Sequence, residues 1–314
     1  MYKTFYILII TVKKYDDLSK IPIWQRFIRM LSLPELEYCS YKGGRLAYRE
    51  KGAGPALFLL HGMNGSSKSW TYLFQSLAAS FRVIAWDAPS FGQSDTFGDS
   101  IDDYKNAAKA LMNNLEIKNA VVVGHSMGGV VALKLAMDQD ALVAGLVLSS
   151  THLGFGQPKG KALIPRYADR IERMNSTGLD IAYAIDRAKG MTSQDTSDSV
   201  IQFLAKIAIG SRMEGIRDGG RMSQEADNAD ICSQVSFPVL ILSGEKDTVI
   251  SNEMHADLTA ALPEAQQYVF PNSGHASYAE YPDLFNQLVK DFSMKVQPGN
   301  RTKIIKTSLK GEKL

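Results

Sequence analysis

A serine stands among glycines in the stretch VVVGHSMGGVVALKLA, which spans residues 121–136. A run of valines leads into Gly124-His125-Ser126-Met127-Gly128, and a segment with helical apolar spacing follows. This Gly-x-Ser-x-Gly spacing is typical of a nucleophile elbow, a sharp turn between a strand and a helix that exposes a serine hydroxyl. Glycines two residues before and after the serine remove the Cβ atoms that would clash in such a turn. We therefore predict that Ser126 is a nucleophile; the alternative is a glycine-rich packing turn.

A serine hydroxyl is a weak nucleophile and needs a general base. The chain has five histidines. His275 is the predicted base because it follows the last strand pattern, in FPNSGHASYAEYP, beside a glycine that lets its loop approach the serine. His152 comes directly after another strand pattern and is a candidate for lining the substrate pocket. His61 follows a different strand, His125 lies inside the elbow, and His255 falls in a helix pattern.

The base in turn needs a carboxylate that orients its imidazole ring. The segment SGEKDTVI, which ends the strand pattern over 238–247, offers Glu245 and Asp247. Asp247 is the predicted partner because it lies further past the strand, in a loop from which it can reach a neighbouring loop. Glu245 is predicted to be a solvated charge at the strand end.

Acyl transfer also requires donors for the oxyanion that develops on the attacked carbonyl. The backbone N–H of Met127, directly after the serine, is one predicted donor. The second is the N–H of Met63, in the turn that follows LFLLHG. Asn64 stands beside it and is a candidate for binding the substrate.

Short apolar runs of the kind that form buried parallel strands surround these residues. They cover residues 55–62, 81–90, 119–126, 142–150, 238–247 and 265–275, and amphipathic helix patterns cover 70–79, 103–115, 129–137, 252–262 and 281–292. An antiparallel pair, LEYCSY and RLAYREKG, precedes them and turns at Gly43 and Gly44. The alternation predicts an α/β fold with a mostly parallel, eight-stranded sheet flanked by helices.

The segment 155–235 interrupts this alternation. It has no strand pattern, but ALIPRYADRIERM, DIAYAIDRA and DSVIQFLAKIAI carry apolar residues at helical spacing. We predict an inserted helical lid, since long connections in such domains are usually functional. Five arginines of this segment could contact a substrate carboxylate, with Arg166 and Arg170 as the first candidates, or all five could be solvated; the others are Arg173, Arg217 and Arg221.

Composition and the termini suggest the remaining organisation. The chain has 314 residues, 45% of them hydrophobic, and a net charge of +2, values typical of a globular protein without a nucleic-acid surface. We divide it into an N-terminal extension (1–35), a first core part (36–154), the lid (155–235), a second core part (236–296) and a basic, disordered tail (297–314). The apolar run near the start is too short to span a membrane. Cys39 and Cys232 lack CxxC spacing, which favours a reducing, cytoplasmic compartment.

Together these segments resemble the α/β-hydrolase superfamily from Leu36 to Phe292. The segments HGMNGSSKSW, VIAWDAPSFGQSD, PVLILSGEKD and GHASYAEYPDLFNQLVKDF are similar to those of 3-oxoadipate enol-lactonases, carboxylesterases, cofactor-free haloperoxidases and meta-cleavage product hydrolases. The chain order Ser126, Asp247, His275 is the order of that superfamily. The resemblance implies a serine hydrolase with Met63 and Met127 as oxyanion donors. We expect it to need no metal or cofactor, to bind a small ester or lactone, and to be able to form a homodimer.

Departures from related patterns narrow the expected reaction. A serine at position 126 differs from the aspartate nucleophile of dehalogenases and epoxide hydrolases. Meta-cleavage hydrolases usually have asparagine and tryptophan where this chain has His125 and Ala276. We therefore expect hydrolysis of a carboxylic ester or an enol-lactone of small to medium size. The alternatives are carbon–carbon bond hydrolysis and, from another class, a non-catalytic binding protein on the same fold.

Overall fold

The structure is a computed structural model that describes residues 33–137 and 142–296. The predictions of an N-terminal extension over 1–35 and of a disordered basic tail over 297–314 therefore fall almost entirely outside the described residues. From Pro34 onward the described chain belongs to one structural unit. No helix among the described residues is long and apolar enough to cross a membrane.

Eight strands form a single sheet in the order β1-β2-β4-β3-β5-β6-β7-β8. Their bounds are β1 Leu36–Tyr41, β2 Gly44–Lys51, β3 Ala56–Leu60, β4 Arg82–Trp86, β5 Ala120–His125, β6 Val143–Ser149, β7 Val239–Gly244 and β8 Gln266–Phe270. The β1–β2 and β2–β4 pairs are antiparallel, and the remaining pairs are parallel. This arrangement confirms the predicted mostly parallel, eight-stranded sheet.

The central strands are apolar on both faces because helices cover both faces. Every residue of β3 and β5 is buried. At the antiparallel edge, the chain turns from β1 to β2 at Lys42 and Gly43, whose φ angles are 45° and 80°. Gly44 is already paired in β2. The turn thus begins one residue earlier than the predicted Gly43–Gly44 position.

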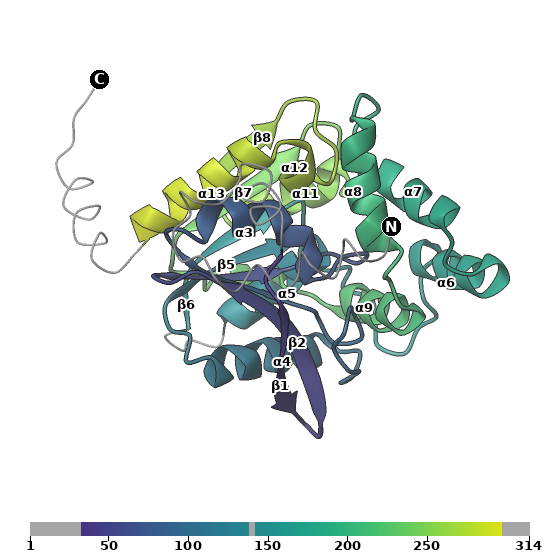
Figure 1. The fold of residues 1–314 in the computed structure, drawn as a ribbon, viewed down its shortest axis with the longest axis horizontal. Coiled ribbons are helices and arrows are strands. Elements are labelled where there is room, and N and C mark those ends of the chain that lie inside the picture. The colour runs from purple at the N-terminus through teal and green to yellow at the C-terminus, as the bar shows by residue number, and fades with distance from the viewer. Residues whose placement is uncertain (1–32, 138–141, 297–314) are drawn as a thin grey trace, which may run out of the picture. The chain divides into compact units, whose positions relative to one another are not determined.

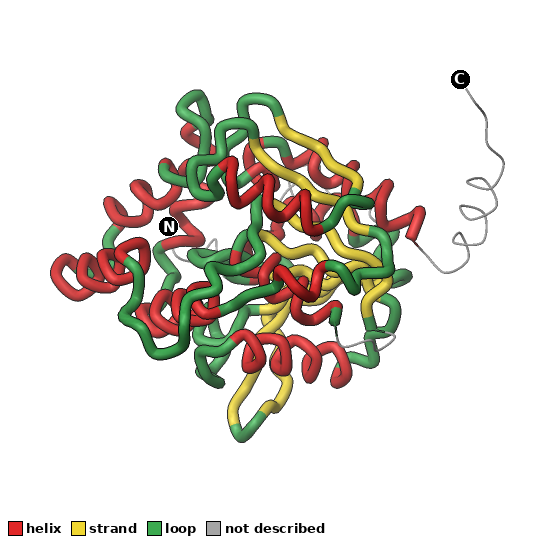
Figure 2. Tube along the Cα trace, turned by 180° about the vertical axis from the view of Figure 1, so that it is seen from behind, coloured by secondary structure: helices red, strands yellow, loops and turns green. Residues whose placement is uncertain are grey.

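Helices pack on the two faces of the sheet, as Figures 1 and 2 show. On one face α3 (Thr71–Leu77) contacts α13 (Pro282–Val296), and on the other α4 (Ile101–Asn114) contacts α5 (Met127–Ala136). The helix α11 (Asn252–Ala261) contributes Leu258 to the apolar cluster on the α5 side. Ser100 starts α4 with a reciprocal capping box to Asp103. Two short helices, η3 (Ser67–Trp70) and α12 (Ser277–Glu280), were not predicted.

Five helices lie between β6 and β7, and no strand does. They are α6 (Pro165–Thr177), α7 (Ile181–Lys189), α8 (Asp198–Ala208), α9 (Met213–Glu225) and α10 (Ala229–Cys232). The first three coincide with the predicted helical patterns, whereas α9 has no counterpart among them. We call residues 155–235 the lid segment; its separation as a domain stays a prediction. In Figure 1, α6 lies beside α9 and α7 lies beside α8, at the edge of the described fold.

Candidate active site

Ser126 sits in a strained turn between β5 and α5. Its φ and ψ angles are 52° and −118°, a region that non-glycine residues rarely adopt and that costs about 1–3 kcal/mol. Two contacts hold the residue there: its N–H donates to the carbonyl of Ser149 at 2.9 Å, and its carbonyl accepts from the Thr151 hydroxyl at 2.6 Å. Ser126 directly precedes the first residue of α5, so helix N–H groups surround it.

The glycines around Ser126 are required by close backbone contacts. A Cβ on Gly128 would lie 2.1 Å from the carbonyl oxygen of Leu60, and one on Gly124 would lie 2.6 Å from the carbonyl oxygen of Gly128. Neither contact can be relieved by moving a flexible side chain, because both involve backbone atoms. The structure therefore confirms the steric reason that the sequence gives for glycine at both positions.

Asp247 and His275 meet in a buried hydrogen bond. Asp247 follows the end of β7, and His275 lies in the loop after β8. The Nδ1 atom of His275 lies 2.9 Å from Oδ2 of Asp247, and the two side chains are 4% and 6% exposed. Since an ionised carboxylate can only accept, Nδ1 is the donor, and in the neutral ring the lone pair is then on Nε2. Glu245 instead is 48% exposed and accepts from the N–H of Asn272 at 2.9 Å.

The Asp247 carboxylate stays ionised although it is buried. Burial alone raises the pKa of Asp247, but the charge and hydrogen bond of His275 and two backbone N–H groups outweigh it, so its pKa is lowered below the ordinary value. Those N–H groups belong to Val249 and Ile250 and lie 2.8 and 3.0 Å from Oδ1. The carboxylate therefore keeps a fixed orientation toward the imidazole.

Glu280 holds the loop that carries His275 against the lid segment. Its Oε2 accepts from the Ser273 hydroxyl and the Gly274 N–H at 2.9 and 2.8 Å. Its Oε1 accepts from the Ser193 N–H and the Thr196 hydroxyl at 2.9 and 2.6 Å. One carboxylate thus joins the loop after β8 to the segment between α7 and α8. Sequence reasoning did not identify this residue.

The turn after β3 brings Met63 next to the elbow. A Cβ on Gly62 would lie 3.2 Å from the Cβ of Ser126, which shows how closely the two turns approach. The N–H of Met63 and that of Met127 have no acceptor among the described residues. Asn64 is 8% exposed, and its Oδ1 is buried without a partner in the described part of the chain.

His61 holds the turn after β3 in place by two hydrogen bonds. Its Nδ1 donates to the Gly62 carbonyl at 2.8 Å, and its Nε2 accepts from the Ala88 N–H at 2.9 Å. The side chain is fully buried, and burial lowers its pKa, so the ring is neutral. His61 therefore connects the turn after β3 to the loop after β4.

His125 connects the elbow to the loop of the predicted base. Its Nε2 lies 3.0 Å from the carbonyl oxygen of His275, and the two rings are 4.7 Å apart between centroids. Burial and the nearby charge of His275 lower the pKa of His125 to about 3, so it is a neutral donor. Sequence reasoning placed His125 in the elbow but gave it no role. Its contact joins loops far apart in sequence, which spacing alone does not reveal.

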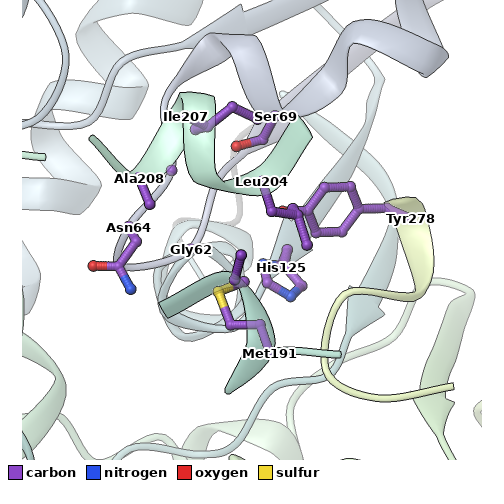
Figure 3. A pocket seen from close by; sticks show the side chains of 11 residues that line it. Gly62, Asn64, Ser69, His125, Met191, Leu204, Ile207, Ala208 and Tyr278 are labelled. Atoms are coloured by element: carbon purple, nitrogen blue, oxygen red, sulfur yellow. The ribbon is translucent and has the colours of Figure 1, made fainter. Parts of the chain in front are cut away.

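A small cavity lies between the turn after β3 and the lid segment (Figure 3). Its volume is about 20 Å³, room for roughly one water molecule. The lining is mostly apolar and comes from the Met63 turn, the elbow, α7, α8 and α12; it comprises Gly62, Asn64, Gly65, Ser69, His125, Ala188, Met191, Leu204, Ile207, Ala208 and Tyr278. The structure thus places Asn64 in a pocket beside the elbow.

The other substrate-binding candidates lie apart from this cavity. His152 is 4% exposed; burial lowers its pKa to about 4, and its Nδ1 accepts from the Gly154 N–H at 3.0 Å. Arg166 donates to the carbonyl of Val249, next to the Asp247 loop, at 2.9 Å. Arg170 lines a second pocket with Arg166, between α6 and α7. Among the described residues, no cluster of three or more histidine, cysteine or acidic side chains could hold a metal ion.

Comparison with known proteins agrees with this fold. An uncharacterized protein of Mycobacterium tuberculosis is 30% identical over 296 residues, covering 87% of this chain and 85% of the relative. A thermophilic esterase from Thermogutta terrifontis superposes with a TM-score of 0.73 at 24% identity, over 83% of this chain and 99% of the other. The enol-lactonase from Burkholderia xenovorans superposes with a TM-score of 0.72 at 23% identity, over 82% and 99%. At these identities the two structures establish the fold alone.

The family model described as alpha/beta hydrolase fold matches residues 55–282. That span runs from β3 through the loop of His275 to the start of α13. It includes the elbow, the lid segment and both members of the Asp247–His275 pair. The chain belongs to the α/β-hydrolase family.

Proposed function

We propose that this hydrolase cleaves a carboxylic ester or a lactone through an acyl-enzyme intermediate on Ser126. The observation that carries the proposal is the buried hydrogen bond between Asp247 and His275 in a fold that also presents Ser126 on a strained turn. A histidine oriented in this way is a general base for a neighbouring hydroxyl. The two similar structures, an esterase and an enol-lactonase, support the same class of reaction.

In the proposed reaction the Ser126 hydroxyl attacks the carbonyl carbon while Nε2 of His275 takes its proton. The tetrahedral intermediate carries its negative charge on the former carbonyl oxygen, which accepts from the N–H groups of Met63 and Met127. The C–O bond to the leaving group then breaks, and the leaving oxygen takes the proton from His275. A water molecule deacylates Ser126 by the same steps, with Asp247 holding the imidazole tautomer throughout.

The cavity in Figure 3 supports a short acyl group. It lies beside Gly62, which approaches Ser126 in space, and beside His125, which directly precedes Ser126 in the sequence. Its volume is about 20 Å³. Since one added methylene in an apolar pocket changes specificity by roughly 10–200-fold, a cavity of this size favours acetyl esters over longer acyl chains.

A substrate panel tests this function. We expect p-nitrophenyl acetate and small lactones to be hydrolysed with a higher kcat/KM than a vinylogous diketone, whose cleavage breaks a carbon–carbon bond. The diketone reaction must also stabilise a carbanion leaving group, and neither His125 nor Ala276 is the residue type that usually accompanies it. A diketone turned over orders of magnitude faster than every ester and lactone would reverse the assignment. Absence of turnover with every substrate, while the chain binds them, would indicate a binding protein.

A further inference from the structure

A pocket rich in arginine lies between α6 and α7, and none of its lining residues takes part in the proposed reaction steps. Its volume is about 370 Å³, and we call it the arginine pocket. Four arginines, a tyrosine and one aspartate supply the polar part of its lining; they are Arg166, Arg170, Arg173, Arg187, Tyr183 and Asp169. Figure 1 shows α6 and α7 next to each other at one edge of the described fold.

The acidic groups near the pocket do not neutralise its arginines. Arg173 donates to Oδ2 of Asp186 at 2.7 Å, and a nitrogen of Arg187 lies 3.7 Å from the same oxygen. The Arg170 side chain lies in α6 and makes no hydrogen bond or ion pair with any residue that the structure describes. Asp169 likewise forms no ion pair within the described part of the chain. Four positive charges thus face two carboxylates, only one of which is engaged.

Two polar groups of this pocket's lining residues are buried without a partner. The Nε of Arg187 has no acceptor, and the hydroxyl of Tyr183 has neither a donor nor an acceptor among the described residues. The Tyr183 side chain is 1% exposed. Leaving such groups buried and unpaired is destabilising. The alternative hypothesis is that these arginines are fully solvated helix charges. In that case no guanidinium nitrogen would be buried and unpaired.

The same surroundings disfavour the positive charge of Arg170. Burial, together with the positive charges of Arg187 and Arg166, lowers the pKa of Arg170 to about 10. The guanidinium remains charged at neutral pH. An anion between these arginines would relieve the repulsion and accept their free N–H groups, because guanidinium groups bind carboxylates in a bidentate manner.

The arginine pocket reaches toward the candidate active site at two points. Arg166 donates to the carbonyl of Val249, whose N–H holds Oδ1 of Asp247. Tyr183 belongs to a small apolar cluster of the lid segment against which Met63, a proposed oxyanion donor, packs. Two lining residues of the arginine pocket, Arg166 and Tyr183, thus connect it to the loop of Asp247 and to the apolar cluster beside Met63.

We propose that the arginine pocket binds a carboxylate of the substrate, so that the preferred substrates are esters with an acidic alcohol portion. The inference rests on the proposed function. The carboxylate belongs to the alcohol portion because the cavity beside the elbow has room for a short acyl group only. The structure thereby assigns Arg170 and Arg187 to substrate binding and Arg166 to the rim of the site.

Matched acidic and neutral substrates test the proposal. The acids are 4-acetoxybenzoate and 3-(4-acetoxyphenyl)propionate, which differ in reach, and the neutral partners are their methyl esters. For Arg170→Gln we expect kcat/KM to fall at least about tenfold for one or both acids and to change less than about twofold for the methyl esters. Arg187→Gln is the second variant, in case the first does not fold. Lys189→Gln is the control, since it removes an exposed charge of α7 outside the pocket.

The outcomes separate the two proposals. If the wild-type chain hydrolyses the methyl esters but neither arginine variant discriminates against an acid, the arginine pocket is not a substrate site, and the proposed function stands. If no ester is hydrolysed, the proposed function fails, and this inference fails with it. Inorganic phosphate or acetate provides a further arm. If either raises Tm in an Arg170-dependent way without competing with the acidic esters, the pocket binds a free anion, which also overturns the substrate assignment.

Discussion

His275 can act as a base only in the tautomer that leaves Nε2 without a proton. The 2.9 Å contact with Asp247 selects that tautomer. In Asp247→Asn, the amide oxygen can still accept from Val249 and Ile250, but the amide nitrogen then faces Nδ1 and favours the opposite tautomer. We expect kcat to fall by about 10³–10⁴ with little loss of stability. Steady-state kinetics and urea unfolding measure the two effects, and a variant that keeps a tenth of its kcat would contradict the role.

Sequence was informative for residues whose role follows from local spacing. Ser126 lies in a five-residue motif, and Asp247 and His275 follow strand patterns, so their place at one sheet edge could be predicted from the chain order. The roles of His125 and Glu280 were missed because they depend on contacts between loops. The partner of His125 is 150 residues away, and Glu280 contacts Ser193 across 87 residues. No local pattern encodes such a pairing.

At the scale of elements, Glu280 joins the loop of His275 to the segment between α7 and α8. Each of its carboxylate oxygens accepts two hydrogen bonds, and the glutamine amide has only one oxygen to replace them. For Glu280→Gln we expect a loss of about 1–3 kcal/mol in unfolding free energy. We also expect kcat to fall by roughly tenfold, because the base loses its anchor. Glu264→Gln, at an exposed position, is the control for both measurements.

The helix α8 sets the size of the cavity beside the elbow. Leu204 and Ile207 line it, whereas Ile209, at the end of the same helix, is 41% exposed and does not. Leu204→Ala enlarges the cavity, so we expect the ratio of kcat/KM for a hexanoate ester to that for an acetate ester to rise about tenfold. Ile209→Ala should leave the ratio unchanged. If the hexanoate-to-acetate ratio of kcat/KM were the same in Leu204→Ala and Ile209→Ala, the acyl group would not bind in this cavity.

The helix α9 shows why the lid segment was only partly predictable. Its sequence contains Gly215, Gly219 and Gly220, and glycine disfavours helix by about 1 kcal/mol per residue. In the structure these glycines permit close packing: a Cβ on Gly219 would lie 2.8 Å from Sδ of Met127, and one on Gly220 would lie 2.8 Å from the Tyr167 ring. Tertiary contact therefore decides this helix against its local preference.

For the whole molecule, buried neutral histidines predict acid sensitivity. The pKa values of His125 and His152 are lowered to about 3 and about 4, from 6.5 when unfolded. The unfolded chain therefore takes up protons that the native state does not, and stability is lost as pH falls below 6.5 toward these values. At about pH 5 each histidine contributes a loss of about 2 kcal/mol relative to neutral pH.

Urea unfolding between neutral pH and about pH 5 measures this dependence. His152→Gln should show a smaller loss of unfolding free energy than the wild-type chain over that interval. A wild-type unfolding free energy that does not decrease across the interval would show that these histidines are protonated in the folded state.

The topology of the molecule was the most predictable feature. The strand patterns are apolar on both faces and alternate with amphipathic helices. Few arrangements satisfy this pattern other than a parallel sheet with helices on both faces. The carboxyl ends of its strands then meet at one edge, which is where Ser126, Asp247 and the Met63 turn lie. How α6 to α10 pack over that edge depends on side-chain fit, and the sequence pattern does not specify it.

Covalent labelling of Ser126 tests the central claim most directly. A fluorophosphonate should modify the wild-type chain on a single peptide that contains Ser126, with loss of ester hydrolysis in proportion to labelling. Ser126→Ala should take up no label and lose at least about three orders of magnitude in kcat, whereas Ser76→Ala, at an exposed position of α3, should behave as the wild type. Label on another residue, or a Ser126→Ala variant that keeps more than a few per cent of kcat, would contradict the account.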